Sequence, residues 1–358
     1  MIKFFTTIGG FLLGSLLIAL LMIISFNPGF FATKMLESNL SNWGTKPTNS
    51  LDRYLDDTLV EEILSSPESM SYMGLDSLDL FTSHNSKWDD YSASNAKEKY
   101  QKVLTQLSVL ENFDENKLEK AKYNLQIAKF SLNNQKKSFE SFQHHFNPLS
   151  QFFGLHLNLV EFLTDTHKIT DEKSVKDYIA RVSGIKKVIE DSIFYLENRA
   201  NKGIYSPAFV YEKAQKQINQ LSSIEVKENP VYLNLASKIK DLDIDIEKQS
   251  FYLAELENQL EGKFKDSYEK LSELMSLQAQ NARPMDGVWG LPNGNDYYQH
   301  RLKIYTTTDF SPQEIHDIGL RMVNQIQNEI ISILEEEGYE DRKSTRLNSS
   351  HQIISYAV

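Results

Sequence analysis

Apolar side chains recur at every third or fourth position through most of this 358-residue chain, and no other feature constrains its fold as strongly. This spacing places them on one face of an α-helix, whereas a half-buried strand alternates at every second position. No alternating stretch of useful length is present, and 15 Gly and 9 Pro are too few for a turn-rich all-β protein. The sequence therefore predicts an all-α fold, a large helical domain with long antiparallel helices.

Capping residues and prolines mark the predicted helix boundaries. Helices are predicted over residues 51–65, 92–112 and 114–130, from Thr170 or Asp171 to Leu196, from Pro207, and from Pro312 to Gly338. Residues 143–169 are expected to be irregular. A run of about fifty residues from Pro230 predicts one long helix with near-heptad spacing. It could form a coiled-coil dimer or a hairpin within the domain, and its aromatic residues favour the hairpin.

The first 34 residues contain an uncharged run from Phe4 to Thr33. A bilayer core of about 30 Å needs about 20 apolar residues in a helix, so this run is long enough to cross it. A cleavable signal peptide is the alternative, although its apolar region is usually about 7–15 residues. We therefore predict residues 1–34 as a single-pass membrane anchor or signal segment. Residues 4–33 would contact the membrane, with the body outside the cytoplasm, on the periplasmic or extracellular side.

Composition excludes several classes of function. The net charge is −11 and no large basic block is present, so a nucleic-acid partner is not expected. The chain contains no Cys, which excludes disulfides, thiolate metal sites and a cysteine nucleophile.

The last eighteen residues, 341–358, have neither a helical nor a strand period. Asp341 to His351 matches the translation of a sequencing-library adapter, and the remaining residues fit an index and the next adapter segment. We therefore predict that residues 341–358 are an artefact. The natural residues would then end near Glu340, and the domain would be truncated there.

No complete catalytic constellation is visible. The chain has no His-Glu-x-x-His motif, no Gly-rich phosphate loop and no Gly-x-Ser-x-Gly elbow. His144 and His145 are adjacent, so on a helix they would point in different directions, and a loop or core role is expected rather than a metal site. No catalytic, cofactor-binding or metal-binding residue is therefore assigned in this chain.

Residues 283–300 form the most unusual stretch, because Gly and Pro are concentrated there between two predicted helices. Four side chains combine a rigid ring with a hydrogen-bonding tip: Trp289, Tyr297, Tyr298 and His300. They are candidates for one wall of a substrate cleft. The alternative is a packed interhelical loop with buried aromatic rings.

This stretch, read on through Thr306-Thr307-Thr308 and Glu314-Ile315-His316 to Leu320, resembles the bacterial domain-of-unknown-function 885 family. Asn293 stands where that family commonly has Asp. Further stretches fit in the same order: residues 51–55, 66–75, 88–92, 153–156, 177–182 and 203–207. The resemblance covers about residues 50–340, and its ordered series of motifs is what makes it specific.

The resemblance implies a largely helical, zinc-metallopeptidase-like parent protein that is exported or membrane-anchored. The family's presumed metal motif, His-Glu-x-x-Pro-Gly-His, lies downstream of the Thr-Thr segment and is absent here. Residues 35–340 would thus be the N-terminal part of the peptidase-like domain, inactive as written, while the complete parent would bind zinc and a peptide substrate. The alternative is a non-catalytic, membrane-anchored helical scaffold or binding module.

Overall fold

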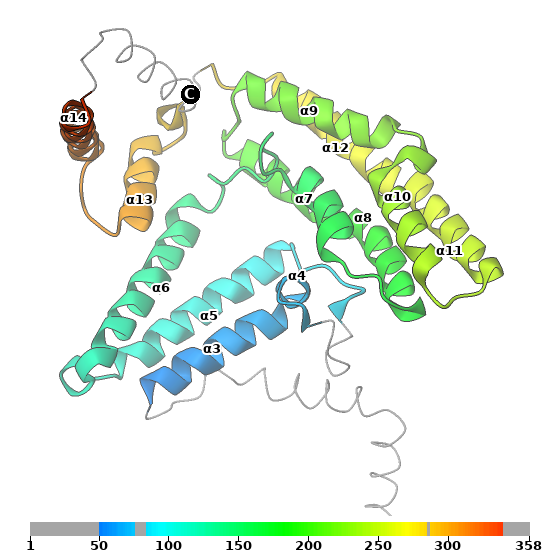
Figure 1. Cartoon of the computed structure of the whole chain (residues 1–358), viewed down its shortest axis with the longest axis horizontal. Helices are drawn as coiled ribbons and strands as arrows, with labels where there is room; N and C mark the ends of the chain where they lie inside the picture. The colour runs from blue at the N-terminus through cyan, green and yellow to red at the C-terminus, as the bar shows by residue number, and fades with distance from the viewer. Residues whose placement is uncertain (1–49, 76–83, 285–286, 339–358) are drawn as a thin grey trace, which may run out of the picture. The chain divides into compact units, whose positions relative to one another are not determined.

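The computed structural model describes residues 50–75, 84–284 and 287–338. Within these residues every regular element is a helix, and the one strand-type pairing is an isolated bridge between Pro207 and Arg283 (Figure 1). The prediction of an all-α fold is confirmed. The predicted anchor and the predicted adapter tail lie outside the described residues. In the described part, no helix is long and apolar enough to span a membrane.

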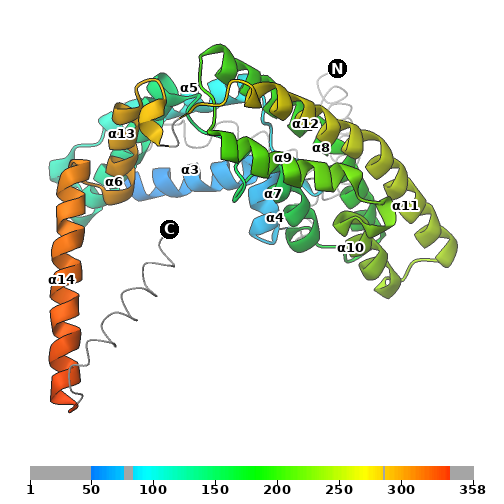
Figure 2. The ribbon, with the colours of Figure 1, turned by 90° about the horizontal axis from the view of Figure 1, so that it is seen from above.

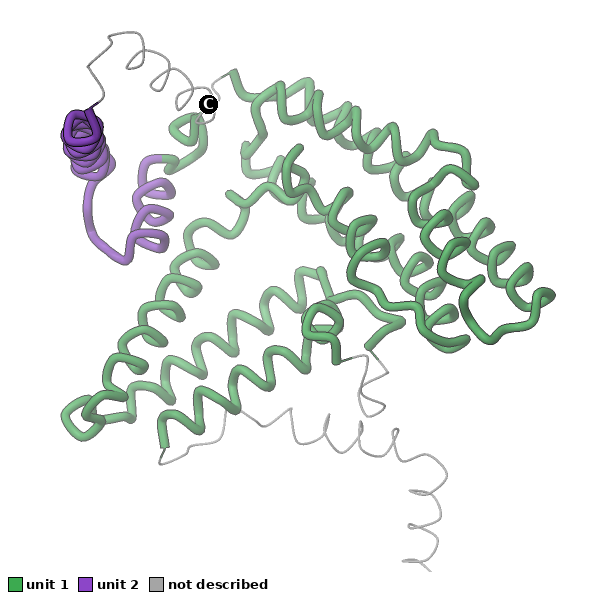
Figure 3. The backbone as a smooth tube through the Cα atoms, viewed as in Figure 1, with its two compact units in different colours: residues 1–294 green, residues 295–358 purple. Residues whose placement is uncertain are grey.

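The chain divides into two compact units, residues 1–294 (unit 1) and 295–358 (unit 2), which Figure 3 colours separately. The helices of unit 1 are α3 (Leu51–Ser65), α4 (Pro67–Tyr72), α5 (Ala93–Glu111), α6 (Lys122–Phe142), α7 (Leu155–Glu161), α8 (Glu172–Asn201), α9 (Ala208–Ser223), α10 (Pro230–Lys238), α11 (Ile246–Gln259) and α12 (Lys265–Ala279). Helix α13 (Gly294–Thr306) begins at the boundary, and α14 (Pro312–Glu336) lies in unit 2.

Polar caps place the starts of α5, α8 and α14 where the sequence predicts them, whereas the helix predicted from residue 114 begins as α6 only at Lys122, after two 3-10 turns. The Ser66 hydroxyl accepts a hydrogen bond from the backbone of Ser69, so the residue that ends α3 also begins α4. Asp171 and Ser174 form a reciprocal capping box at the start of α8, and α14 starts with a second capping box. These side chains satisfy backbone N–H groups that have no partner inside the helix.

The predicted fifty-residue helix from Pro230 is wrong. Helix α10 ends at Lys238, and α11 begins at Ile246 and packs against α10. In between, Asp alternates with Leu and Ile over residues 241–245, a period of two that suits extended backbone. The chain therefore folds back within the domain instead of continuing as one helix. From Ile246 to Ala279 it stays helical, with a π-helical turn at Leu260–Phe264.

The expectation that residues 143–169 are irregular is also wrong in part. Helix α7 and a π-helical turn, Phe162–Thr166, occupy much of this segment. The buried side chains His156, Leu159, Val160 and Leu163 recur at helical spacing on one face of this stretch. Helix α7 is only seven residues long, however, and no side chain caps its start at Gly154, so it lacks the signal that marks the longer helices.

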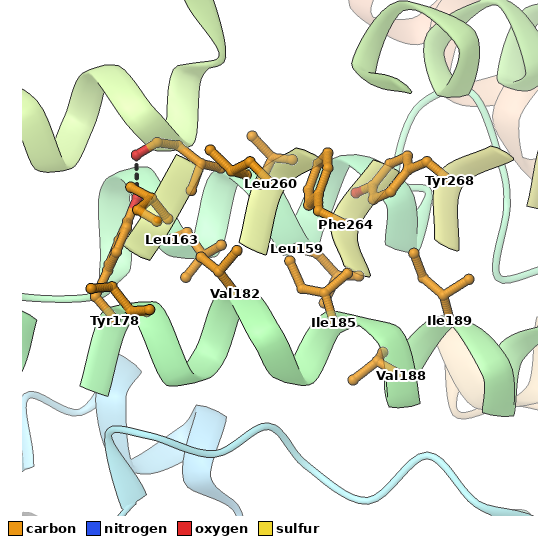
Figure 4. Close-up of a cluster of buried hydrophobic side chains, with 14 of the residues drawn as sticks. Leu159, Leu163, Tyr178, Val182, Ile185, Val188, Ile189, Leu260, Phe264 and Tyr268 are labelled. Atoms are coloured by element: carbon orange, nitrogen blue, oxygen red, sulfur yellow. Dashed lines mark hydrogen bonds between the residues drawn. The ribbon is translucent and has the colours of Figure 1, made fainter. Parts of the chain in front are cut away.

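The main core of unit 1 lies between α8 and the helices that cover it. The apolar stripe of α8 from Val175 to Leu196 is buried and packs against the π-helical turn Leu260–Phe264 and α12, with Leu159 and Leu163 in the same cluster (Figure 4). The Tyr178 hydroxyl donates to the Val231 carbonyl at 2.9 Å, which fixes α10 on α8. Helix α9 lies along α12 in both views (Figures 1 and 2). A smaller core joins α3, α5 and α6.

Candidate functional site

The segment that carries Trp289 is held at both ends by hydrogen bonds within unit 1. The Arg283 backbone N–H donates to the Ser206 carbonyl, and its Nε donates to the Tyr205 carbonyl, each at 3.1 Å. At the other end, His145 Nε2 lies 2.7 Å from the Pro292 carbonyl oxygen. A carbonyl can only accept, so Nε2 carries the proton. The backbone from Arg283 to Pro292 is thereby tied to the segments that flank α8.

Trp289 sits in a 3-10 turn, Val288–Gly290, and its side chain is 64% exposed. A Cβ atom at Gly287 would overlap the indole ring, and one at Gly294 would overlap the Val288 carbonyl. Glycine at both positions therefore allows the tight turn that displays the ring. Trp289 is an exposed aromatic surface on an anchored segment, not a buried loop residue.

The other three predicted site residues lie in unit 2, on α13. The expectation that the loop extends through residue 300 is wrong, because α13 begins at Gly294 directly after Asn293, which has a left-handed φ of 52°. On this helix Tyr298 is exposed, Tyr297 is half-buried and His300 is 2% exposed. The structure therefore does not gather the four candidates within one unit.

A buried arginine that sequence reasoning missed supports the Trp289 segment. Arg199, in the last turn of α8, donates from Nε to the His144 carbonyl at 3.0 Å and from Nη1 to the Ser206 hydroxyl at 3.2 Å. The Tyr211 hydroxyl in turn accepts from the Ser206 backbone N–H at 3.2 Å. Within the described ranges Arg199 forms no ion pair with a carboxylate.

Burial shifts the pKa values of two residues that lie near the Trp289 segment, His144 and Arg199. Burial, with Lys202 nearby, lowers the pKa of His144, so its ring is neutral at pH 7. Burial also lowers the pKa of Arg199, although a guanidinium remains charged near neutral pH. The Arg199 guanidinium is buried, and its Nε and Nη1 are directed at groups of the protein itself, so we interpret it as a support for the Trp289 segment.

The described residues do not fit a zinc ion. No group of three or more His, Asp or Glu side chains in the described ranges is arranged to hold a metal. His145 Nε2 is already directed at the Pro292 carbonyl, and His156 Nε2 lies 3.0 Å from Gln217. No step of metal-assisted chemistry is therefore assigned to the residues that the structure describes.

Comparison with known proteins places the chain in a family. The family model described as "Bacterial protein of unknown function (DUF885)" matches residues 67–353. The chain belongs to the DUF885 family. A solved structure of a proposed lipoprotein from Colwellia psychrerythraea has a similar fold, with a TM-score of 0.68 and 20% identity. The match covers 87% of this chain and 52% of that one, so this chain spans about half the length of the relative. No curated protein matches the chain.

Several stretches that resemble the DUF885 family meet around Arg181, which is fully buried in α8. Its guanidinium donates to the Ser71 hydroxyl at 2.8 Å and to the carbonyls of His84, at 3.1 Å, and Lys87, at 2.9 Å. The Trp88 indole N–H returns a hydrogen bond to the Arg181 carbonyl at 2.7 Å. One residue of the 177–182 motif therefore fixes the 66–75 and 88–92 motifs onto α8.

Near the Arg181 cluster, the carboxylates of Glu68 and Asp89 each accept a hydrogen bond from the other residue's backbone N–H. Asp89 accepts from the Glu68 backbone N–H, and Glu68 accepts from the Asp89 backbone N–H, each at 3.1 Å. The Tyr91 hydroxyl donates to both Glu68 oxygens at 3.0 Å. Burial, then the Asp89 charge, raises the pKa of Glu68. Because backbone and hydroxyl groups already engage both carboxylates, we interpret the pair as structural.

The hydrogen bond between Arg181 and His167 makes the stability of unit 1 sensitive to acid. Arg181 Nη1 can only donate, so His167 Nδ1 accepts at 2.9 Å, and its Nε2–H donates to the Ser174 carbonyl at 3.2 Å. Burial, then the Arg181 charge, lowers the pKa of His167 to about 3. A histidine in the unfolded chain has a pKa of about 6.5. The unfolded state thus binds a proton first, and stability present above pH 6.5 is lost as the pH falls toward 3.

We expect His167→Gln to flatten this pH dependence. From pH 7 to pH 5, the free energy of unfolding should fall by about 2 kcal/mol more in the wild type than in the variant. Urea titrations followed by circular dichroism measure both slopes. The exposed His316→Gln variant is the matched control and should keep the wild-type slope. Equal slopes for His167→Gln and wild type would contradict the assignment of His167 as a buried neutral acceptor.

Proposed function

We propose that this chain is the N-terminal, non-catalytic part of an envelope-anchored, zinc-peptidase-like protein, with the unit 1 segment that carries Trp289 forming part of one wall of its peptide cleft. The observation that carries the proposal is the anchored Trp289 segment, which holds a largely exposed aromatic ring on a backbone tied down at both ends. Rigid aromatic surface binds peptide side chains at little cost in conformational entropy.

The length of the relative and its description support the proposal. This chain matches about half of a protein described as a proposed lipoprotein, which is a class attached to cell envelopes. The uncharged run from Phe4 to Thr33 supports membrane attachment of this chain itself. The zinc ligands would belong to the part of the complete protein that follows Glu340. There a bound zinc would polarise the scissile carbonyl and activate water.

We expect Trp289→Ala in the complete protein to raise KM for peptide hydrolysis about tenfold with little change in kcat, because a substrate contact far from the reacting bond contributes uniform binding. Hydrolysis of a fluorogenic peptide library measures both constants. Phe251→Ala is the matched control, since Phe251 on α11 is equally exposed, at 63%, and lies away from the segment. Unchanged KM in Trp289→Ala would remove this residue from the cleft.

The second candidate function is a non-catalytic, anchored binding module. The exposed apolar face of α14 favours it, because a helix that buries no residue requires a partner. The two functions can be distinguished in the complete protein. A zinc-peptidase-like protein should bind about one zinc per chain and hydrolyse peptides, whereas a binding module need do neither.

A further inference from the structure

Helix α14 has a continuous apolar face that none of the residues described by the structure buries. None of its 25 residues is buried. Seven large apolar side chains are 40–59% exposed: Leu320, Met322, Val323, Ile326, Ile330, Ile333 and Leu334. In proteins, packing of the apolar face is the main source of a helix's stability, more than helix propensity. Contiguous exposed apolar surface of this kind marks an interaction site.

The spacing of the apolar residues identifies the kind of surface that α14 fits. The central stripe runs through Ile315, Ile318, Met322, Ile326, Ile330 and Ile333. Its five steps cover 18 residues (333 − 315), a mean of 3.6 residues per step. A two-stranded coiled coil requires 3.5, and its seam is narrower than this face, which Val323 and Leu334 broaden. The pattern is that of a straight helix lying on a globular core, so pairing with a second copy of α14 is disfavoured.

The charges on α14 exclude a lipid surface. No Lys or Arg occurs between Arg321 and Gly338, whereas helices that lie on membranes carry basic residues on the polar face. From Met322 to Leu334 the only charged residue is Glu329, and the polar positions are otherwise Asn, Gln and Ser. Depletion of charge beside an apolar stripe is typical of a protein interface.

We propose that the apolar face of α14 packs against helical apolar surface in the second half of the complete protein, and that α14 thereby joins the two halves. The match covers 52% of the Colwellia structure, so that relative has nearly as much chain outside the match as inside it. This further chain is the occupant that we assign to the apolar face of α14. The proposal rests on the proposed function only in requiring that a second half exists. It requires neither zinc nor peptidase activity.

Hydrogen exchange of residues 312–336 tests this interface in two proteins, the 358-residue chain and the complete protein read from the source gene. We expect α14 amides to exchange at least tenfold more slowly in the complete protein. Ile326→Gln/Ile330→Gln should remove that protection, while Asn324→Ala/Asn328→Ala, on the opposite face, should retain it. Sedimentation velocity of the 358-residue chain reports whether two copies pair instead.

Three results would overturn the proposal: equally fast exchange in both proteins, a defined dimer of the 358-residue chain that protects α14, or a source gene with no second half. Failure of the proposed function gives a different result. A complete protein that protects α14 but binds no zinc and cleaves no peptide would retain the interface and remove the peptidase-like reading.

Discussion

Replacing Arg181 with methionine should lower the free energy of unfolding of unit 1 by about 3–5 kcal/mol, because several buried acceptors lose their donor at once. Methionine retains much of the side-chain volume, but five acceptors would each lose a donor: the carbonyls of Pro67, His84 and Lys87, the Ser71 hydroxyl and His167 Nδ1. Each buried acceptor left unpaired costs about 1–3 kcal/mol. The loss would approach the whole stability of an ordinary domain.

Urea unfolding followed by circular dichroism measures this loss. Arg53→Met is the control, because the Arg53 side chain is exposed and its ion pair with Asp57 spans one helical turn at the surface; such pairs contribute about 0–1 kcal/mol. A loss below about 1 kcal/mol in Arg181→Met would contradict the role of Arg181 as the residue that fixes α4 and residues 84–88 onto α8.

Replacing Phe264 with alanine should cost about 3–5 kcal/mol, the range for truncating a buried aromatic ring. Phe264 is the last residue of the π-helical turn Leu260–Phe264 and is buried in the main core. Its ring stacks on that of Tyr268, with the ring centroids 4.3 Å apart (Figure 4). The surrounding helices would have to collapse into the space or leave a cavity, and both outcomes destabilise the fold.

The same urea titration measures Phe264→Ala, and the exposed Phe251→Ala is the matched control. Phe251 is also on the 246–279 helical run, so the two substitutions share local backbone and differ in burial. A cost for Phe264→Ala as small as that for Phe251→Ala would mean that the core shown in Figure 4 is not formed.

Amphipathic helices with polar caps were predictable from sequence. The starts of α5, α8 and α14 follow from Ser92, Asp171 and Ser311, because a cap is a local interaction within four residues. Helix α7 was missed because it has only seven residues and begins at Gly154 without a side-chain cap. The break after α10 was missed because apolar residues keep a spacing of three and four across it. The backbone there follows instead the alternation of Asp with Leu and Ile over residues 241–245.

The residues that organise the candidate site were less predictable. Arg181 lies at the edge of the buried stripe of α8, next to Tyr178 and Val182, so a helical wheel could have flagged it as a buried charge. No such signal exists for the contact between His145 and Pro292, since 147 residues separate them. Trp289 stood out because glycine and proline surround it, and those residues produce the turn that exposes its ring.

The central claim is that this chain is the first part of a longer zinc-peptidase-like protein. The measurement that tests it most directly is the sequence of the source DNA through the codon for Glu340. The account predicts that the reading frame continues for several hundred residues and contains His-Glu-x-x-Pro-Gly-His. A gene that encodes Asp341 to Val358 and then stops would contradict it and leave the anchored binding module as the better account.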